Sequence, residues 1–126
     1  MRALIVGAGS VGLGVASCLL KSGWQAHLVG RPATGAALAA HGLWRTGLFG
    51  ECRCPPGSFG TGPDLESAGR SPFDYVLVCA KSYDSEAVAA DLARHAHLLA
   101  ETTRVVLFQN GYGNVEVFSA ALSPER

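Results

Sequence analysis

The sequence predicts an α/β fold, a Rossmann-like, doubly wound and mainly parallel sheet in a three-layer αβα arrangement, on three observations. Short apolar runs typical of buried parallel strands recur along the chain. Segments with the apolar spacing of helices alternate with these runs, as they do in βαβ units. A Gly-x-Gly-x-x-Gly pattern stands where the first run meets the first helical segment. We therefore expect one dinucleotide-binding domain over residues 1–126.

A first strand, helix and strand fill the amino-terminal part of the chain. Residues 3–6 form a short apolar run that ends at glycine, which predicts a buried strand. From residue 11 to residue 20 the spacing becomes helical, and the predicted buried face consists of Val11, Val15, Cys18 and Leu19. Gly23 is suited to cap this helix, and residues 25–29 predict the second strand.

The middle of the chain is less regular. Residues 32–40 are rich in alanine, with proline at the start and Gly42 beyond the end, which predicts a short second helix. Residues 43–48 and 51–54 predict a hairpin or two short edge strands. Residues 55–72 are dominated by Gly, Pro and Ser, so we expect a surface loop with one helical turn at 64–68.

Two further strands and two further helices complete the predicted alternation. Residues 75–79 form the next apolar run, and Asp84 is suited to cap a helix that reaches about residue 100. Residues 105–108 predict the last clear strand, and residues 114–122 predict a last helix. Strands and helices in this order give a parallel sheet with right-handed crossovers.

The glycine pattern is the first candidate binding site. A helix start offers unpaired N–H groups and the positive end of the helix dipole to a diphosphate. Glycines allow the tight turn, the close approach of the backbone and the packing of the helix on the sheet. Glycine triplets also occur in structural turns, but here the pattern follows a strand and opens a helix. The predicted cofactor-binding residues are Gly7, Ala8, Gly9, Ser10, Val11 and Gly12.

The end of the second strand indicates which dinucleotide binds. Selection of NAD uses an acidic residue there to bind the ribose hydroxyls, and this chain has none. Gly30 and Arg31 follow the strand instead, so that a small residue leaves room and a guanidinium pairs with a 2′-phosphate. The sequence therefore favours NADP(H) as the cofactor, with Arg31 as a cofactor-binding residue. The alternative is that Arg31 is an ordinary solvated arginine.

Composition and charge exclude several classes of function. Ten basic and ten acidic residues give a formal net charge of zero, so we expect no nucleic-acid partner. The apolar run over residues 3–20 follows Met1 and Arg2 and resembles a secretory signal. Its four glycines weaken such a helix, and they interrupt the run too often for a membrane span. We expect a cytoplasmic protein that does not associate with a membrane.

The cysteines and histidines give no metal or disulfide signature. The four cysteines lack the spacing of a disulfide framework, which favours a reducing compartment. Cys52 and Cys54 resemble half of a metal site, but no second pair follows at ligand spacing, so they are read as thiols on a short strand. The four histidines are not paired at ligand spacing either; they are His27, His41, His95 and His97.

Two more segments point to a known family. Residues 76–84 read Val-Leu-Val-Cys-Ala-Lys-Ser-Tyr-Asp, and residues 109–114 read Gln-Asn-Gly-Tyr-Gly-Asn. With the glycine loop and the Val-Gly-Arg at 29–31, they make the chain resemble the N-terminal domain of the ketopantoate reductase family over essentially all of its length. The lysine and the Gln-Asn-Gly-x-Gly-Asn run are together much more specific than the glycine loop.

The resemblance implies roles for Lys81 and Asn110. In the family, the matching lysine and asparagine line the nicotinamide and substrate end of the cleft, so both are candidate catalytic and cofactor-binding residues. Ligands of open α/β sheets also bind beyond the carboxyl ends of strands, where both residues are predicted to lie. The Lys81 ammonium would attract a carboxylate, and the Asn110 amide would bind substrate or cofactor. Without the resemblance, an ordinary lysine and a turn-forming Asn-Gly would be preferred.

The resemblance also implies an activity, the NADPH-dependent reduction of ketopantoate or a related 2-oxo acid, as in pantothenate biosynthesis. Family members have a C-terminal helical domain that closes over the substrate and contributes the lysine taken as general acid. The chain stops at Arg126, before such a domain, so we expect no turnover by these residues alone. A homodimer or the missing domain would complete the site. The alternative is a stand-alone dinucleotide-binding or sensing module without turnover.

Overall fold

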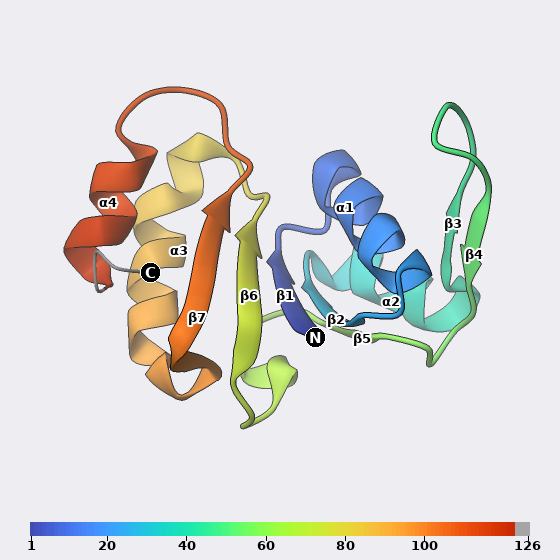
Figure 1. Cartoon of the computed structure of the whole chain (residues 1–126), viewed down its shortest axis with the longest axis horizontal. Helices are drawn as coiled ribbons and strands as arrows, with labels where there is room; N and C mark the ends of the chain where they lie inside the picture. Colours follow the sequence, from blue (N-terminus) through green and yellow to red (C-terminus); the bar gives the residue numbers. More distant parts are fainter. Residues whose placement is uncertain (123–126) are drawn as a thin grey trace.

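The computed structural model describes residues 1–122 and contains a five-stranded sheet between two layers of helices (Figure 1). The strand order is β5-β2-β1-β6-β7, and every neighbouring pair is parallel. The order matches that of a doubly wound dinucleotide-binding sheet. In such a sheet, successive strands are added outward on one side of β1 and then, from β6 onward, on its other side. The predicted fold class is therefore confirmed. The strands are β1 (Arg2–Val6), β2 (Gln25–Val29), β5 (Gly60–Gly62), β6 (Phe73–Val78) and β7 (Leu99–Leu107).

Helices cover both faces of the sheet, and a small antiparallel hairpin lies beside them (Figure 1). The α-helices are α1 (Ser10–Lys21), α2 (Pro32–His41), α3 (Ser85–Arg94) and α4 (Asn114–Ala121). The hairpin consists of β3 (Leu43–Arg45) and β4 (Cys52–Cys54), as predicted but shorter. Short 3-10 turns are η1 (Glu66–Ala68), η2 (Ser82–Asp84) and η3 (Ala96–Leu98). None of the helices within residues 1–122 combines the length and the apolar character needed to cross a bilayer.

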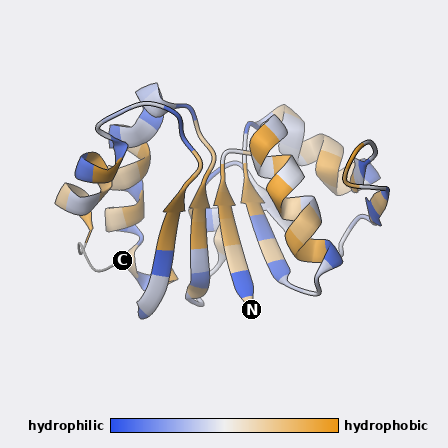
Figure 2. Cartoon of the chain, turned by 45° about the horizontal axis from the view of Figure 1, so that its top comes forward, coloured by the Kyte–Doolittle hydropathy of each residue, from blue (hydrophilic) through white to orange (hydrophobic). Residues whose placement is uncertain are grey.

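Alternate residues of the strands supply two apolar cores, one on each face of the sheet. Leu4 of β1 packs in the core that α3 and α4 cover, where Leu92 and Phe118 are buried. Ile5 packs in the opposite core with Ala16 of α1. Figure 2 shows apolar residues along the strands and polar residues at the starts of the strands. Burial on both faces explains the continuous apolar runs that predicted the strands.

Helix α1 buries only part of the predicted face, because Val15 and Leu19 pack against the core but Val11 and Cys18 do not. Its buried residues are Gly12, Ala16 and Ser17, whereas Val11 is 52% exposed and Cys18 is exposed. Small residues face the sheet because the helix packs close to it, and larger apolar residues flank the contact. The pattern of large apolar residues therefore predicted the helix and the flank of its contact face, but not the small residues at the centre of that face.

Two segment boundaries also differ from the prediction. Helix α3 ends at Arg94, not near residue 100, and β7 begins at Leu99. Ala96 and Leu99 continue the helical spacing of Val88 and Leu92, which predicted the longer helix, although the backbone has left the helix at His95. Strand β5 was predicted as loop, because Gly-Thr-Gly has no apolar alternation. A Cβ on Gly60 would collide with the His27 ring, so a larger residue there would displace that ring.

Candidate functional site

The loop between β1 and α1 depends on two of its glycines for packing. Gly7 has a φ of +107°, and a Cβ there would lie 2.5 Å from the backbone nitrogen of Ala80. A Cβ on Gly12 would meet the carbonyl oxygen of Gly7 and would lie 3.2 Å from Cγ2 of Ile5. A side chain at either position would push the loop away from β6 or lift α1 off the sheet. These two glycines therefore set the shape of the loop.

Gly9 differs, because the rest of the protein leaves it free space. It is the N-cap residue of α1, and a Cβ built on it meets no atom within 4 Å. The first turn of α1 contains no acidic residue, and Ser10 is exposed. N–H groups in a first helical turn lack partners within the helix and carry its positive end. The chain itself does not require glycine at position 9, and the free space lies beside polarised N–H groups.

The end of β2 holds the glycine loop in place. The backbone nitrogens of Gly7 and Ala8 donate to the carbonyl oxygen of Val29 at 2.9 and 3.1 Å. A Cβ on Gly30 would lie 2.6 Å from the Cβ of Ala8, so Ala8 already occupies the room that we expected Gly30 to leave for a phosphate. Arg31 comes next and is exposed at the N-cap of α2.

These segments border a cavity of about 350 Å³ beyond the carboxyl ends of β1, β2 and β6. It lies where the strand order reverses, the position at which doubly wound sheets bind ligands. The cavity brings together five of the predicted site residues, which come from the β1–α1, β2–α2 and β6–α3 connections. Its lining consists of Gly7, Ala8, Gly9, Gly30, Arg31, Thr34, Cys79, Ala80, Lys81, Tyr83 and Asp84.

The remaining predicted residues lie outside this lining. Ser10 and Val11 are exposed on the first turn of α1, and Gly12 is buried beneath it. Asn110 is exposed after β7, in the connection next to that of Lys81. The sequence prediction did not include Thr34 or Asp84. The position of Asp84 just after Lys81 pointed to this edge of the sheet, but no pattern indicated Thr34.

The β6–α3 connection supplies groups of different charge to the cavity. Within residues 1–122, the Lys81 ammonium takes part in no hydrogen bond or ion pair. The Asp84 carboxylate lines the same cavity, and the Cys79 thiol lies deeper, where burial raises its pKa to about 11. The cavity thus combines a free cation with a thiol that stays neutral near pH 7.

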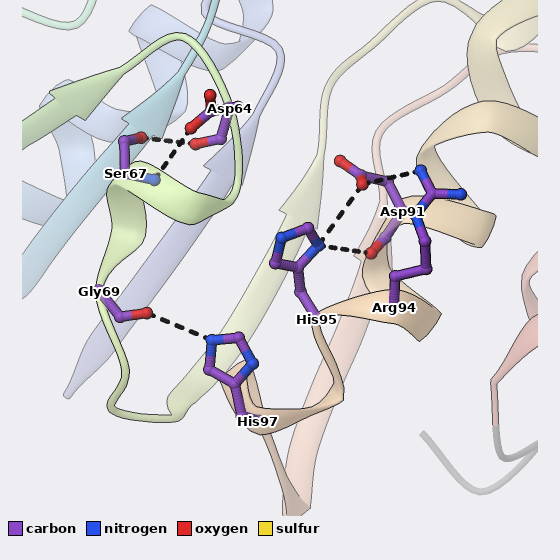
Figure 3. Close-up of polar contacts among 7 residues, drawn as sticks. All are labelled: Asp64, Ser67, Gly69, Asp91, Arg94, His95 and His97. Carbon is purple, nitrogen blue, oxygen red and sulfur yellow. Dashed lines mark hydrogen bonds and ion pairs between the residues drawn. The ribbon is translucent and has the colours of Figure 1, made fainter.

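His95 and His97 lie at the opposite end of the sheet, where each contacts a backbone carbonyl oxygen (Figure 3). Nδ1 of His95 is 2.9 Å from the carbonyl oxygen of Asp91, and Nε2 of His97 is 3.3 Å from that of Gly69. In the described part of the chain, no three metal-ligating side chains gather in one place. Each of these rings uses one nitrogen in a structural contact.

The chain is similar to known proteins in sequence and in fold. A family model described as ketopantoate reductase PanE/ApbA matches residues 3–126. The 2-dehydropantoate 2-reductase of Aquifex aeolicus is 31% identical over 116 residues, which are 92% of this chain and 34% of that protein. The crystal structure of a PanE/ApbA family ketopantoate reductase from Ralstonia eutropha superposes with a TM-score of 0.83 at 27% identity, over 97% of this chain and 38% of that one.

A more distant structure shares the fold. D-mandelate dehydrogenase, solved with NADH and anilino(oxo)acetate, has a TM-score of 0.81 at 21% identity, over 98% of this chain and 38% of that chain. The present chain therefore spans little more than a third of the length of each of these three proteins.

Proposed function

The chain belongs to the ketopantoate reductase PanE/ApbA family, and we propose that it binds NADPH for the reduction of a 2-oxo acid to a 2-hydroxy acid. Family membership supports a dinucleotide-dependent oxidoreductase. The observation that carries the finer proposal is the cavity at the switch point of the sheet, which is lined by the glycine loop, by Arg31 and by Lys81. These three features match a diphosphate, a 2′-phosphate and a substrate carboxylate.

The start of α1 is proposed to bind the diphosphate. Two glycines bring the loop close to the sheet, and the third leaves space beside the free N–H groups of the first turn. Absence of acidic residues from this turn leaves the positive end of the helix uncompensated. The free space and the uncompensated positive helix end therefore fit a diphosphate.

Arg31 is proposed to select NADPH over NADH. Its guanidinium is exposed on the rim of the cavity, one residue beyond the glycine that packs on Ala8. A planar guanidinium binds a phosphate monoester through paired, charge-assisted hydrogen bonds. The end of β2 has no carboxylate that would repel the additional phosphate.

Lys81 and Asn110 are proposed to form the substrate end of the site. Bound NADPH would supply a hydride to the ketone carbon. The Lys81 ammonium would hold the substrate carboxylate, and the Asn110 amide would orient substrate or cofactor. We further propose that the proton and the exclusion of water come from polypeptide equivalent to the remainder of the longer relatives.

A fluorescence titration of the chain with NADPH and with NADH tests the cofactor proposal. We predict tighter binding of NADPH, and we predict that Arg31→Ala weakens it about 10-fold while NADH binding stays unchanged, because only NADPH carries the 2′-phosphate. Arg94→Ala is the matched control, since Arg94 pairs with Asp91 at the opposite end of the sheet. Equal affinity of the unaltered chain for both dinucleotides would refute the proposed preference.

A further inference from the structure

Three side chains connect the two loops that carry Lys81 and Asn110. Gln109 lies in the loop after β7, Ser85 begins α3 and Asn114 begins α4. Ser85 is 3% exposed and Asn114 is 7% exposed. They are two of only four buried polar side chains among the described residues. We call these three residues the clasp.

The hydrogen bonds of the clasp form a chain in which each side chain donates to the next group, from Gln109 through Ser85 and Asn114 to the backbone of Asn110. The Gln109 amide nitrogen is 3.0 Å from the carbonyl oxygen of Ala80, 3.2 Å from that of Lys81 and 3.0 Å from Oγ of Ser85. The hydroxyl of Ser85 then donates to Oδ1 of Asn114 at 2.8 Å. The Asn114 amide nitrogen donates in turn to the carbonyl oxygen of Asn110 at 3.2 Å.

The single hydroxyl proton of Ser85 makes this arrangement specific. Oε1 of Gln109 is also within reach of the hydroxyl, at 3.2 Å, but one proton forms one strong bond and the Asn114 oxygen is closer. Ser85 therefore donates to Asn114, and its oxygen shares the two amide protons of Gln109 with the carbonyl oxygens of Ala80 and Lys81. The Ser85–Asn114 bond is buried, so losing it leaves a polar group that water cannot reach easily.

We propose that the clasp residues Gln109, Ser85 and Asn114 are positioning residues that hold the Lys81 loop and the Asn110 loop in one fixed arrangement. The inference rests on the proposed function in that these two loops form the substrate end of the site. The backbone carbonyls of residues 80, 81 and 110 are tied to one network, so neither loop can shift without breaking a bond in it. The clasp would act through Lys81 and Asn110 and would touch no substrate itself.

Kinetics of the whole gene product test this role, with ketopantoate as the probe and NADPH as the reductant. Ser85→Ala is expected to lower kcat/KM by roughly 10-fold to 100-fold, because small misplacement of substrate-binding groups has effects of this size. The Kd for NADPH should change much less than kcat/KM, since the start of α1 and Arg31, which are proposed to hold the phosphates, are unaltered. Ser85→Thr keeps the hydroxyl and should restore most of the activity, whereas Asn114→Asp removes the donor to Asn110 and should reproduce the loss.

Thr103→Val provides the matched control. Thr103 is fully buried in the middle of β7, where its hydroxyl donates to the carbonyl oxygen of Phe73. Its replacement removes a buried hydroxyl and lowers the melting temperature without altering kcat/KM. A fall in kcat/KM of equal size in Thr103→Val and Ser85→Ala at equal loss of stability would overturn the proposal, and so would unchanged kinetics in Ser85→Ala.

An NMR measurement on the chain separates this inference from the proposed function. We expect Ser85→Ala to shift the backbone amide signals of both Lys81 and Asn110, and Ser85→Thr to leave both near their original positions. A shift confined to one of the two loops would overturn the clasp even if the enzyme were active. If the unaltered protein reduces no 2-oxo acid, the proposed function fails, and these amide shifts alone decide whether the clasp exists.

Discussion

The two sides of the cavity at the switch point of the sheet are held in place by different interactions. On the β1–α1 side, backbone geometry does the positioning, because missing side chains at Gly7 and Gly12 allow the loop and α1 to approach the sheet. On the β6–β7 side, the loops with Lys81 and Asn110 are held by side-chain hydrogen bonds of the clasp. The first side should therefore fail through steric collision and the second through loss of single hydrogen bonds.

Replacement of Gly7 by alanine should give the largest effect. The new Cβ would strain a φ of +107° and would lie 2.5 Å from a backbone nitrogen that cannot move independently of β6. We expect a loss of about 3 kcal/mol in the free energy of unfolding, measured by urea denaturation.

Gly47→Ala is the matched control for the collision. Gly47 has a nearly identical φ of +106°, but a Cβ there meets nothing within 4 Å. Only the backbone strain remains, so the loss should be about 1 kcal/mol. Equal losses at the two positions would show that contact with Ala80 does not shape the glycine loop.

Gly9→Ala should separate ligand binding from stability. Because the protein leaves open space at this position, the free energy of unfolding should change by less than about 0.5 kcal/mol. The methyl group would occupy space beside the N–H groups of the first turn, so the Kd for NADPH should rise at least about 10-fold. Urea denaturation and fluorescence titration measure the two quantities.

Gly14→Ala is the control for this split. Gly14 also lies in α1 with open space around its Cβ position, but it is more than one helical turn from the loop. Alanine there should leave NADPH binding unchanged and should stabilise the helix by about 1 kcal/mol. Unchanged NADPH affinity in Gly9→Ala would remove the start of α1 from the binding site.

The Cys79 thiol should produce a smaller effect, confined to alkaline pH. Burial raises its pKa from 9.0 to about 11, so the folded protein holds the thiol proton more tightly than the unfolded chain does. This contribution to stability is present below about pH 9 and is lost as the pH rises toward 11. Cys79→Ser should reduce the fall in the urea midpoint between these pH values.

The comparison variant is Cys18→Ser, since Cys18 is exposed. That replacement should leave the alkaline profile as it is. Burial also raises the pKa of Cys54 to about 11, so part of the alkaline loss should remain in Cys79→Ser. An unaltered profile in Cys79→Ser would contradict the buried, neutral state of this thiol.

The two sides also differ in how far the sequence predicts them. A required glycine is visible in a sequence, and Gly7, Gly9 and Gly12 lie within one short motif after an apolar strand. The clasp is not visible, because Ser85 is 24 residues from Gln109 and 29 residues from Asn114. Only the strand order brings these residues together.

For secondary structure too, elements with local sequence signals were predicted and those that depend on distant contacts were missed. Strand β2 was predicted with its observed bounds, because apolar periodicity and flanking glycine are local signals. Strand β5 was missed because its stability comes from pairing with β2 and not from its own residues. The boundary between α3 and β7 was missed because buried leucines such as Leu98 and Leu99 are equally compatible with a helix and with a strand.

A crystal structure of the chain with NADPH would test the central claim most directly, namely that one crevice at the switch point of the sheet holds the dinucleotide. The account predicts density for the diphosphate beside Gly9 and for the 2′-phosphate against Arg31, with the nicotinamide toward Lys81. Density for the dinucleotide elsewhere on the protein, or none beside Gly9 and Arg31 at saturating NADPH, would contradict it.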